Sequence, residues 1–320
     1  MAKQQLRIGT RASQLALWQA NWVKSELEQR YPDLEVSLVK IKTTGDKILD
    51  VPLARVGGKG LFTKEIEEAM LAGEIEVAVH SMKDVPTYFP PGLGLRCITH
   101  REDPRDIVIL RPGVSSWQEL PIGGRVGTSS LRRKAMLLHT RPDLQMLDIR
   151  GNVETRIRKL TEDNLDAVVL AAAGMHRLGF AARISEYLSV EVSLPAIGQG
   201  ALGLETRRDD AATNALIDFF NHPETAHAVI AERALLARLE GGCQVPIAAY
   251  GTVGGETLTL TGLVASVDGR QMLKKRIHGP VTDAERLGTS LADDLLIMGA
   301  GKILNEVYQR ETFNAGREEV

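Results

Sequence analysis

The chain has 320 residues, a length typical of two domains of ordinary size or of three small ones. Its 39 basic and 41 acidic residues leave a net charge of −2, and aromatic residues make up only 4% of the chain. This composition argues against a nucleic-acid-binding protein, which would need a strongly basic domain or an aromatic base-stacking surface.

The two cysteines, Cys97 and Cys243, are too few for a disulfide framework. The sequence contains no apolar signal segment at its N-terminus and no apolar run of 18 residues. These features predict a cytoplasmic protein that keeps its thiols reduced and does not bind a membrane.

Strands and helices alternate in the first hundred residues, which is typical of a parallel α/β domain. The helix after the first strand is expected to begin at Ser13, a favourable N-cap. LRCITH, around Cys97, predicts a further buried strand. The predicted strands of this set are 6–10, 34–41 and 76–80, and the predicted helices are 13–31 and 61–73.

A second set of the same kind begins near residue 105. Its opening, RVGTSSLRRKA, is similar to RIGTRASQLAL in the first set, which indicates either two similar lobes or a chance likeness of two short units. The predicted strands are 124–128, 144–149 and 166–172, and the predicted helices are 130–140, 152–162 and 174–180.

The last hundred residues have a different pattern. An amphipathic helix leads to Cys243, an antiparallel pair of strands follows at 257–266 and 271–278, and a final helix is expected over 283–309. This pattern predicts a small α+β domain. The segment 42–60, rich in glycine and lysine, is the best candidate for a mobile loop or lid.

Arginines and hydroxyl groups recur where predicted strands end and helices begin. In α/β sheets ligands bind at these ends, backbone N–H groups there favour anions, and guanidinium groups bind carboxylates. The pattern predicts a cleft between two lobes for a ligand with many carboxylates or phosphates; the alternative is a set of solvated surface arginines. The residues are Arg11, Ser13, Thr128, Ser129, Ser130, Arg132, Arg133, Arg150, Arg156 and Arg177.

Asp84 follows the predicted strand in AVHSMKDVP, beside Lys83. A carboxylate at such a strand end can move a proton or stabilise a developing cation, although a turn or helix-cap aspartate is the simpler alternative. The charged segment REDPRD (101–106) is interpreted as a hinge or as a segment of salt bridges between the lobes, rather than as a catalytic segment.

Cys243 lies in LEGGCQVP, where two glycines and a proline leave it on an open turn. It is either a chance loop cysteine or a nucleophile. No histidine is singled out as the partner that a cysteine hydrolase needs. The spacing of histidines and cysteines predicts no metal site.

Seven motifs together resemble those of the hydroxymethylbilane synthase (porphobilinogen deaminase) family, in order and from about residue 5 to residue 310. One small departure is Ile107, where the family more often has alanine. The motifs are GTRASQLAL, VGGKGLFTKE, HSMKDVP, VGTSSLRR, IRGNVETR, LPAIGQGALGLE and LEGGCQVP.

The resemblance implies a monomeric transferase that joins four porphobilinogen molecules head-to-tail on a dipyrromethane cofactor and then releases hydroxymethylbilane by hydrolysis. It implies that Cys243 holds the cofactor through a thioether and that Asp84 is the catalytic carboxylate. The implied cofactor-binding residues are Lys83, Thr128, Ser130, Arg132, Arg133 and Arg150. The implied substrate-binding residues are Arg11, Ser13, Lys59, Phe62, Arg156, Arg177 and Gln199.

The fold expected from the resemblance is α/β, with two periplasmic-binding-protein-like lobes of mostly parallel sheets and a small α+β third domain. Hinges are expected near 101–105 and 194–200. The expected domains are 1–100 with 200–218 for the first lobe, 105–194 for the second, and 222–320 for cofactor attachment.

A rival interpretation is a non-catalytic two-lobed binding protein for a polycarboxylate. This interpretation accounts for the lobes, the hinges and the arginines. It does not account for the missing export signal, and it gives Cys243 no function.

Overall fold

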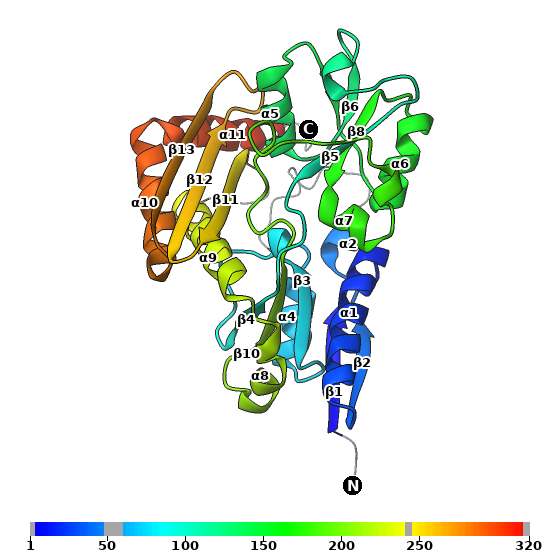
Figure 1. Cartoon of the computed structure of the whole chain (residues 1–320), viewed down its shortest axis with the longest axis vertical. Helices are drawn as coiled ribbons and strands as arrows, with labels where there is room; N and C mark the ends of the chain where they lie inside the picture. The colour runs from blue at the N-terminus through cyan, green and yellow to red at the C-terminus, as the bar shows by residue number, and fades with distance from the viewer. Residues whose placement is uncertain (1–3, 48–59, 241–244, 316–320) are drawn as a thin grey trace.

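The computed structural model describes residues 4–47, 60–240 and 245–315. These residues form two α/β lobes and a third α+β domain. Figure 1 shows the first lobe at the lower end of the molecule, the second at the upper right and the third domain at the upper left. No helix in the described ranges combines the length and the apolar character needed to cross a membrane.

The first lobe contains a five-stranded sheet with the order β2-β1-β3-β10-β4. Strands β1, β2 and β3 are mutually parallel neighbours, whereas β10 runs antiparallel to both β3 and β4. Its strands are β1 (Gln4–Thr10), β2 (Leu34–Lys40), β3 (Val77–Ser81), β4 (Leu93–Ile98) and β10 (Leu202–Arg207). Its helices are α1 (Gln14–Arg30), α2 (Thr44–Lys47), α4 (Lys64–Leu71) and α8 (Ala211–Ile217).

The second lobe contains a five-stranded sheet with the order β7-β6-β8-β5-β9. Here β6 is parallel to β7 and β8, and β5 is antiparallel to β8 and β9. Its strands are β5 (Asp106–Leu110), β6 (Arg125–Gly127), β7 (Gln145–Leu147), β8 (Ala167–Ala171) and β9 (Glu186–Tyr187). Its helices are α5 (Leu131–Thr140), α6 (Val153–Glu162) and α7 (Ala172–Arg177).

The two sheets have the same pattern of directions, so the similarity between the openings of the two halves reflects two similar lobes. The predicted two-lobed α/β fold with a third α+β domain is confirmed. Each sheet is mostly parallel, as predicted: four of its five strands run in one direction, and only β10 in the first lobe and β5 in the second run against them. Strand β10 begins beside Ser81 at the end of β3, and β5 begins beside Ala171 at the end of β8.

The two connections between the lobes lie side by side. The backbone N–H of Glu102 donates to the carbonyl of Gly200 (3.2 Å), and the Arg101 Nε donates to the carbonyl of Gln199 (2.8 Å). The Gln199 side chain in turn donates to the carbonyl of Pro104 (2.6 Å). The segments 101–105 and 194–200, predicted as hinges, therefore form a hydrogen-bonded junction; the hinge motion itself stays a prediction.

Glu232, from the third domain, is fully buried and fastens that domain to this junction. Its carboxylate accepts from Arg101 Nη1 (2.6 Å), from the backbone N–H of Gly198 (2.6 Å) and from the backbone N–H of Gly251 (2.8 Å). One side chain thus joins the first connection, the second connection and a strand of the third domain.

The third domain packs three helices against an antiparallel sheet with the order β11-β12-β13. The helix predicted over 283–309 is two helices, because Gly299 adopts a left-handed φ of +105° between them. The domain consists of β11 (Ile247–Gly254), β12 (Thr257–Ala265), β13 (Met272–Pro280), α9 (Pro223–Arg238), α10 (Ala284–Ile297) and α11 (Ala300–Ala315).

Most predicted elements are confirmed, with shorter ends in places. Ser13 is the N-cap of α1 and accepts from the N–H of Ala16, and Cys97 is buried in β4. Strand β11 was not predicted. The domain boundaries stay a proposal, supported by the place of β10 inside the first sheet.

Gly200 provides a test of the junction, because it has a φ of +97° and a Cβ added there would lie 2.3 Å from the carbonyl oxygen of Glu102. We expect Gly200→Ala to lower the free energy of unfolding, measured by denaturant titration. Gly92→Ala is the matched control, since Gly92 has a φ of +88° and open space around the added Cβ. The control should cost about 1–2 kcal/mol of backbone strain, and Gly200→Ala about 2 kcal/mol more from the clash. Equal losses would contradict a tight junction.

Candidate functional site

Asp84 lies in a single 3₁₀ turn (Met82–Asp84) that follows β3 directly. The turn is held from the third domain, because Arg233 of α9 donates to the carbonyls of Val85 (3.0 Å) and Pro86 (2.7 Å). A Cβ at Gly198 would lie 2.7 Å from the Cβ of Met82, so the second connection packs directly against the same turn. The carboxylate is therefore fixed at the carboxyl end of a central strand.

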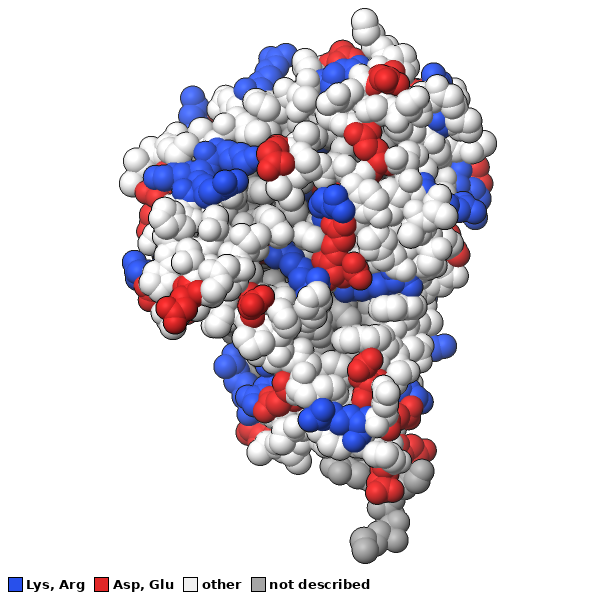
Figure 2. Space-filling view, in the orientation of Figure 1, with Lys and Arg blue, Asp and Glu red and all other residues white. Residues whose placement is uncertain are grey.

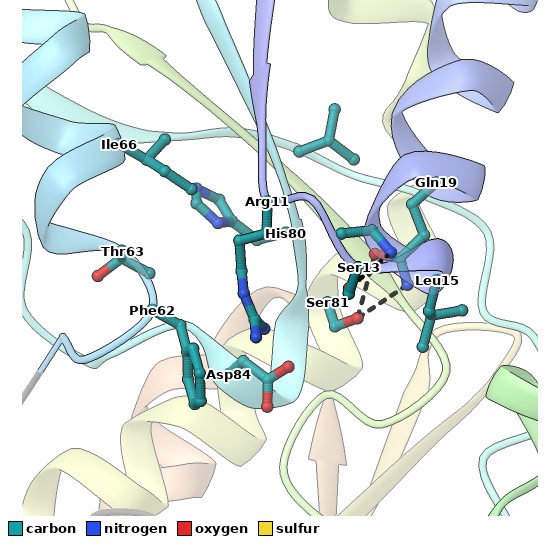
Figure 3. Close-up of a pocket in the computed structure, with 12 residues that line it drawn as sticks. Arg11, Ser13, Leu15, Gln19, Phe62, Thr63, Ile66, His80, Ser81 and Asp84 are labelled. Carbon is teal, nitrogen blue, oxygen red and sulfur yellow. Dashed lines mark hydrogen bonds between the residues drawn. The ribbon is translucent and has the colours of Figure 1, made fainter. Parts of the chain in front are cut away.

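A pocket in the first lobe has Asp84 in its wall; we call it the Asp84 pocket (Figure 3). Figure 3 shows the Arg11 guanidinium, the Phe62 ring and the Asp84 carboxylate gathered at one end of it. The Arg11 guanidinium lies 4.0 Å from the centroid of the Phe62 ring, and its Nε donates to Asp46 (3.1 Å). The other lining residues are Ser13, Leu15, Ala16, Gln19, Thr63, Ile66, Val79, His80 and Ser81.

The start of α1 forms another side of this pocket. The side-chain oxygen of Ser13 caps the helix, while Gln19, further along α1, donates to the Ser81 hydroxyl (2.8 Å). This hydrogen bond joins α1 to the end of β3. The pocket wall is therefore built from the β1–α1 turn and the β3 end, the two places that the sequence pattern singled out.

Behind the pocket lies a buried group of titratable side chains. His80 Nε2 is 2.9 Å from a carboxylate oxygen of Glu205, which is fully buried. Burial raises the pKa of the neighbouring Glu67, and the charge of Glu205 raises it further. The sequence analysis missed this group, although His80 lies inside one of its motifs.

Five cationic side chains from both lobes form a group that we call the cationic cluster, and two of them, Lys83 and Arg156, interact with the charge of Asp84. The pKa of Lys83 is lowered to about 8, chiefly by burial; the charges of Arg133 and Arg156 also lower it, while Asp84 and Asp106 raise it. Burial likewise lowers the pKa of Arg156 to about 10, with Arg133 and Arg150 adding to the effect. The members are Lys83 of the first lobe and Arg132, Arg133, Arg150 and Arg156 of the second.

The cationic cluster carries more positive charge than the carboxylates among it can balance. Among the described residues, Asp84, Asp106 and Asp148 supply negative charge to these groups. Positive charge that is withdrawn from water raises the free energy of the folded protein unless anions balance it. An anionic ligand with several carboxylates would remove this cost.

Several predicted residues of the second lobe have structural tasks at helix starts. Ser130 is the N-cap of α5 and accepts from the N–H of Arg133, and the hydroxyl of buried Thr128 accepts from the N–H of Ser130 (3.3 Å). The Arg156 Nε donates to the carbonyl of Gly151 (2.8 Å). Contacts of these residues with a ligand stay predictions.

The side chains of four other predicted residues donate hydrogen bonds to acceptors within the protein. Arg132, Arg133 and Gln199 all donate to the buried carboxylate of Asp106. Arg177 Nη2 donates to the carbonyl of Gly200 (2.6 Å), at the junction. Asp106 belongs to REDPRD, and this segment does form ion pairs, within the second lobe at Asp106 and to the third domain through Arg101 and Glu232; an ion pair between the two lobes stays a prediction.

Lys59 and Cys243 lie outside the described residues, as does most of the segment 42–60. Their predicted roles stay predictions. Within the described ranges, no three side chains of histidine, cysteine, aspartate or glutamate come together as metal ligands would.

The two lobes, the turn that holds Asp84 and the cationic cluster define an α/β protein with the features expected of a site for a polyanionic ligand. Residues 6–215 match the family model described as "Porphobilinogen deaminase, dipyromethane cofactor binding domain", and residues 226–297 match "Porphobilinogen deaminase, C-terminal domain". The chain belongs to the porphobilinogen deaminase family.

Similar proteins named "Porphobilinogen deaminase" come from Geobacter metallireducens, at 73% identity, and Geobacter sulfurreducens, at 72%. Both alignments cover 311 residues, 97% of this chain and 97% of the relative. Among solved structures, the periplasmic aliphatic sulphonate binding protein of Escherichia coli matches at 17% identity with a TM-score of 0.41, over 74% of this chain and 71% of that one.

The lowered pKa of Lys83 predicts a pH-dependent stability for the protein prepared without ligand. The folded protein binds this proton less tightly than the unfolded chain does, so stability rises as the pH passes from about 8 to the ordinary lysine value near 10.5. Lys83→Met should therefore stabilise the protein at pH 7, by about 1–2 kcal/mol, and the gain should disappear above the upper value. The measurement is denaturant unfolding at several pH values.

The control for this prediction is Lys64→Met, since Lys64 is an exposed lysine on α4. It should leave the pH dependence of unfolding unchanged. A Lys83→Met protein with the pH profile of the wild type would show that the pKa of Lys83 is not lowered in the folded protein.

Proposed function

We propose that the chain deaminates porphobilinogen and joins four molecules of it head-to-tail at the Asp84 pocket and the cationic cluster, and that it then releases hydroxymethylbilane by hydrolysis. Membership of the porphobilinogen deaminase family supports the activity. The observation that carries the location is the surplus of buried cationic groups from both lobes around one fixed carboxylate.

The residues present fit a dipyrromethane. Its pyrrole rings carry acetate and propionate groups, and such carboxylates would balance the positive charge that the cationic cluster withdraws from water. When bound, the dipyrromethane supplies the pyrrole carbon to which each new unit is joined. We propose Cys243 as its point of attachment through a thioether, because a thiolate is a good nucleophile and the flanking glycines leave room for an adduct.

The side chains of the Asp84 pocket have complementary tasks in this proposal. Arg11, oriented by Asp46, binds a substrate carboxylate, and the Phe62 ring packs against the pyrrole. Asp84 accepts hydrogen bonds from pyrrole N–H groups and stabilises the positive charge that develops when ammonia leaves. Since Arg233 and the second connection hold the turn of Asp84, little reorganisation is needed as that charge forms.

The monomeric state and the cytoplasmic location predicted from the sequence stay predictions. Porphobilinogen as substrate is part of the proposal and follows from the family.

The mass of the purified protein separates a synthase from a binding protein. We expect an intact mass above that of the sequence by one dipyrromethane, and no excess in Cys243→Ser. Cys97→Ser is the matched control, because Cys97 is buried in β4 and burial raises the pKa of its thiol to about 12, which keeps it unreactive. The control should keep the excess mass. A wild-type protein with the plain sequence mass, unchanged by added porphobilinogen, would support the rival binding protein.

Asp84→Asn tests the catalytic carboxylate. It keeps the size of the side chain and removes its charge, so we expect normal substrate binding with turnover slowed by about 3–4 kcal/mol, a factor of hundreds. Asp84→Glu, which keeps the charge but moves it by one methylene, should retain more activity. The measurement is single-turnover consumption of porphobilinogen by cofactor-loaded protein. An Asn variant within a few-fold of the wild type would make Asp84 a structural turn residue.

A further inference from the structure

Asp106 is the first residue of β5, and four side chains donate hydrogen bonds to its carboxylate. It is fully buried and lies immediately after the first connection. Its oxygens accept hydrogen bonds from Arg132 Nη1 (2.7 Å) and Nη2 (3.2 Å), Arg133 Nε (3.0 Å) and Nη2 (2.7 Å), Ser193 Oγ (2.6 Å) and Gln199 Nε2 (3.0 Å).

These donors come from separate parts of the chain. Arg132 and Arg133 belong to the first turn of α5, which opens towards the carboxyl edge of the second sheet. Ser193 and Gln199 belong to the second connection between the lobes. Asp106 therefore fastens the start of α5 to both connections at once.

The charge of Asp106 is permanent. Burial by itself would raise its pKa, but the charges and hydrogen bonds of Arg132 and Arg133 hold that pKa far below its usual range. The single carboxylate of Asp106 pairs with the guanidinium groups of both Arg132 and Arg133, so these three side chains together carry a net positive charge. Arg133 is close enough to Lys83 and Arg156 to lower the pKa of each, which places this surplus beside the site.

We propose that Asp106 is a positioning residue, which sets the guanidinium groups of Arg132 and Arg133 in one geometry for the carboxylates of the bound pyrrole chain. Because it also accepts from Ser193 and Gln199, it makes that geometry depend on the arrangement of the two connections. This inference rests on the proposed function of the cationic cluster. It assigns to Asp106 the orientation of two of the arginines in that cluster.

Two explanations of anion binding give opposite results for Asp106→Asn. The substitution adds one positive charge to the region. If the arginines act only through their summed charge, a polycarboxylate should bind faster and more tightly. If Asp106 orients them, binding should weaken in spite of the added charge, since guanidinium groups bind carboxylates through directed pairs of hydrogen bonds.

The experiment uses full-length protein prepared without cofactor. Porphobilinogen is added, and covalent loading is followed by intact mass for the wild type and Asp106→Asn; KM and kcat are then measured on the loaded fraction. We expect loading to slow at least tenfold in Asp106→Asn and KM to rise more than kcat falls. Asp106→Glu, which keeps the charge, should recover part of the loading rate.

Asp166→Asn is the matched control. Asp166 is also buried, accepts from Arg111 and from the N–H of Arg125, and precedes β8, at the end of that strand opposite to Asp106. The control should lose unfolding stability yet load within twofold of the wild type.

Loading of Asp106→Asn at the wild-type rate or faster would overturn the proposal, as would an equal loss in Asp166→Asn. If Asp106→Asn does not fold, Ser193→Ala removes a single donor to the carboxylate; it should slow loading several-fold, and an unchanged rate overturns the proposal. A wild-type protein that takes up no mass from porphobilinogen contradicts the proposed function itself.

Discussion

The buried carboxylate of Glu232 is the interaction on which the arrangement of the three bodies depends. It holds Arg101 of the first connection, Gly198 of the second and Gly251 of the third domain, all within hydrogen-bond distance. A buried ion pair adds little net stability when its desolvation is considered, but breaking one partner is costly. Such a pair therefore specifies one arrangement of its surroundings, and here the surroundings include the turn that carries Asp84.

The balance of charge in the cationic cluster differs from that around Glu232. At Glu232 the buried charges are matched, whereas the cationic cluster has more cations than carboxylates. Figure 2 shows acidic and basic side chains intermixed over the visible face, in keeping with the near-neutral net charge. The positive surplus is thus a local property of the site. Without ligand, this uncompensated positive charge lowers the stability of the folded protein. The same charge attracts the carboxylates of a polyanionic ligand, which stabilises the protein when it binds.

The sequence predicted the parts of the fold that depend on local signals. Ser13 and Ser130 were found as helix starts because hydroxyl groups there satisfy free backbone N–H groups. The pairing of Arg132 and Arg133 with Asp106 was not predicted, since 26 residues separate the partners and residue type alone does not reveal which acid an arginine meets. Strand β11 was missed because its sequence has no clear alternation of apolar and polar residues. The break at Gly299 was missed because the apolar pattern continues through it.

The return of the chain to the first lobe at β10 has a consequence for the order in which the protein is made. Strand β10 lies between β3 and β4, so the sheet of the first lobe has a gap until residue 207 has been synthesised. The sheet of the second lobe is complete as soon as β9, ending at Tyr187, has been synthesised. A ribosome working from the N-terminus therefore supplies all strands of the second lobe before it supplies the last strand of the first.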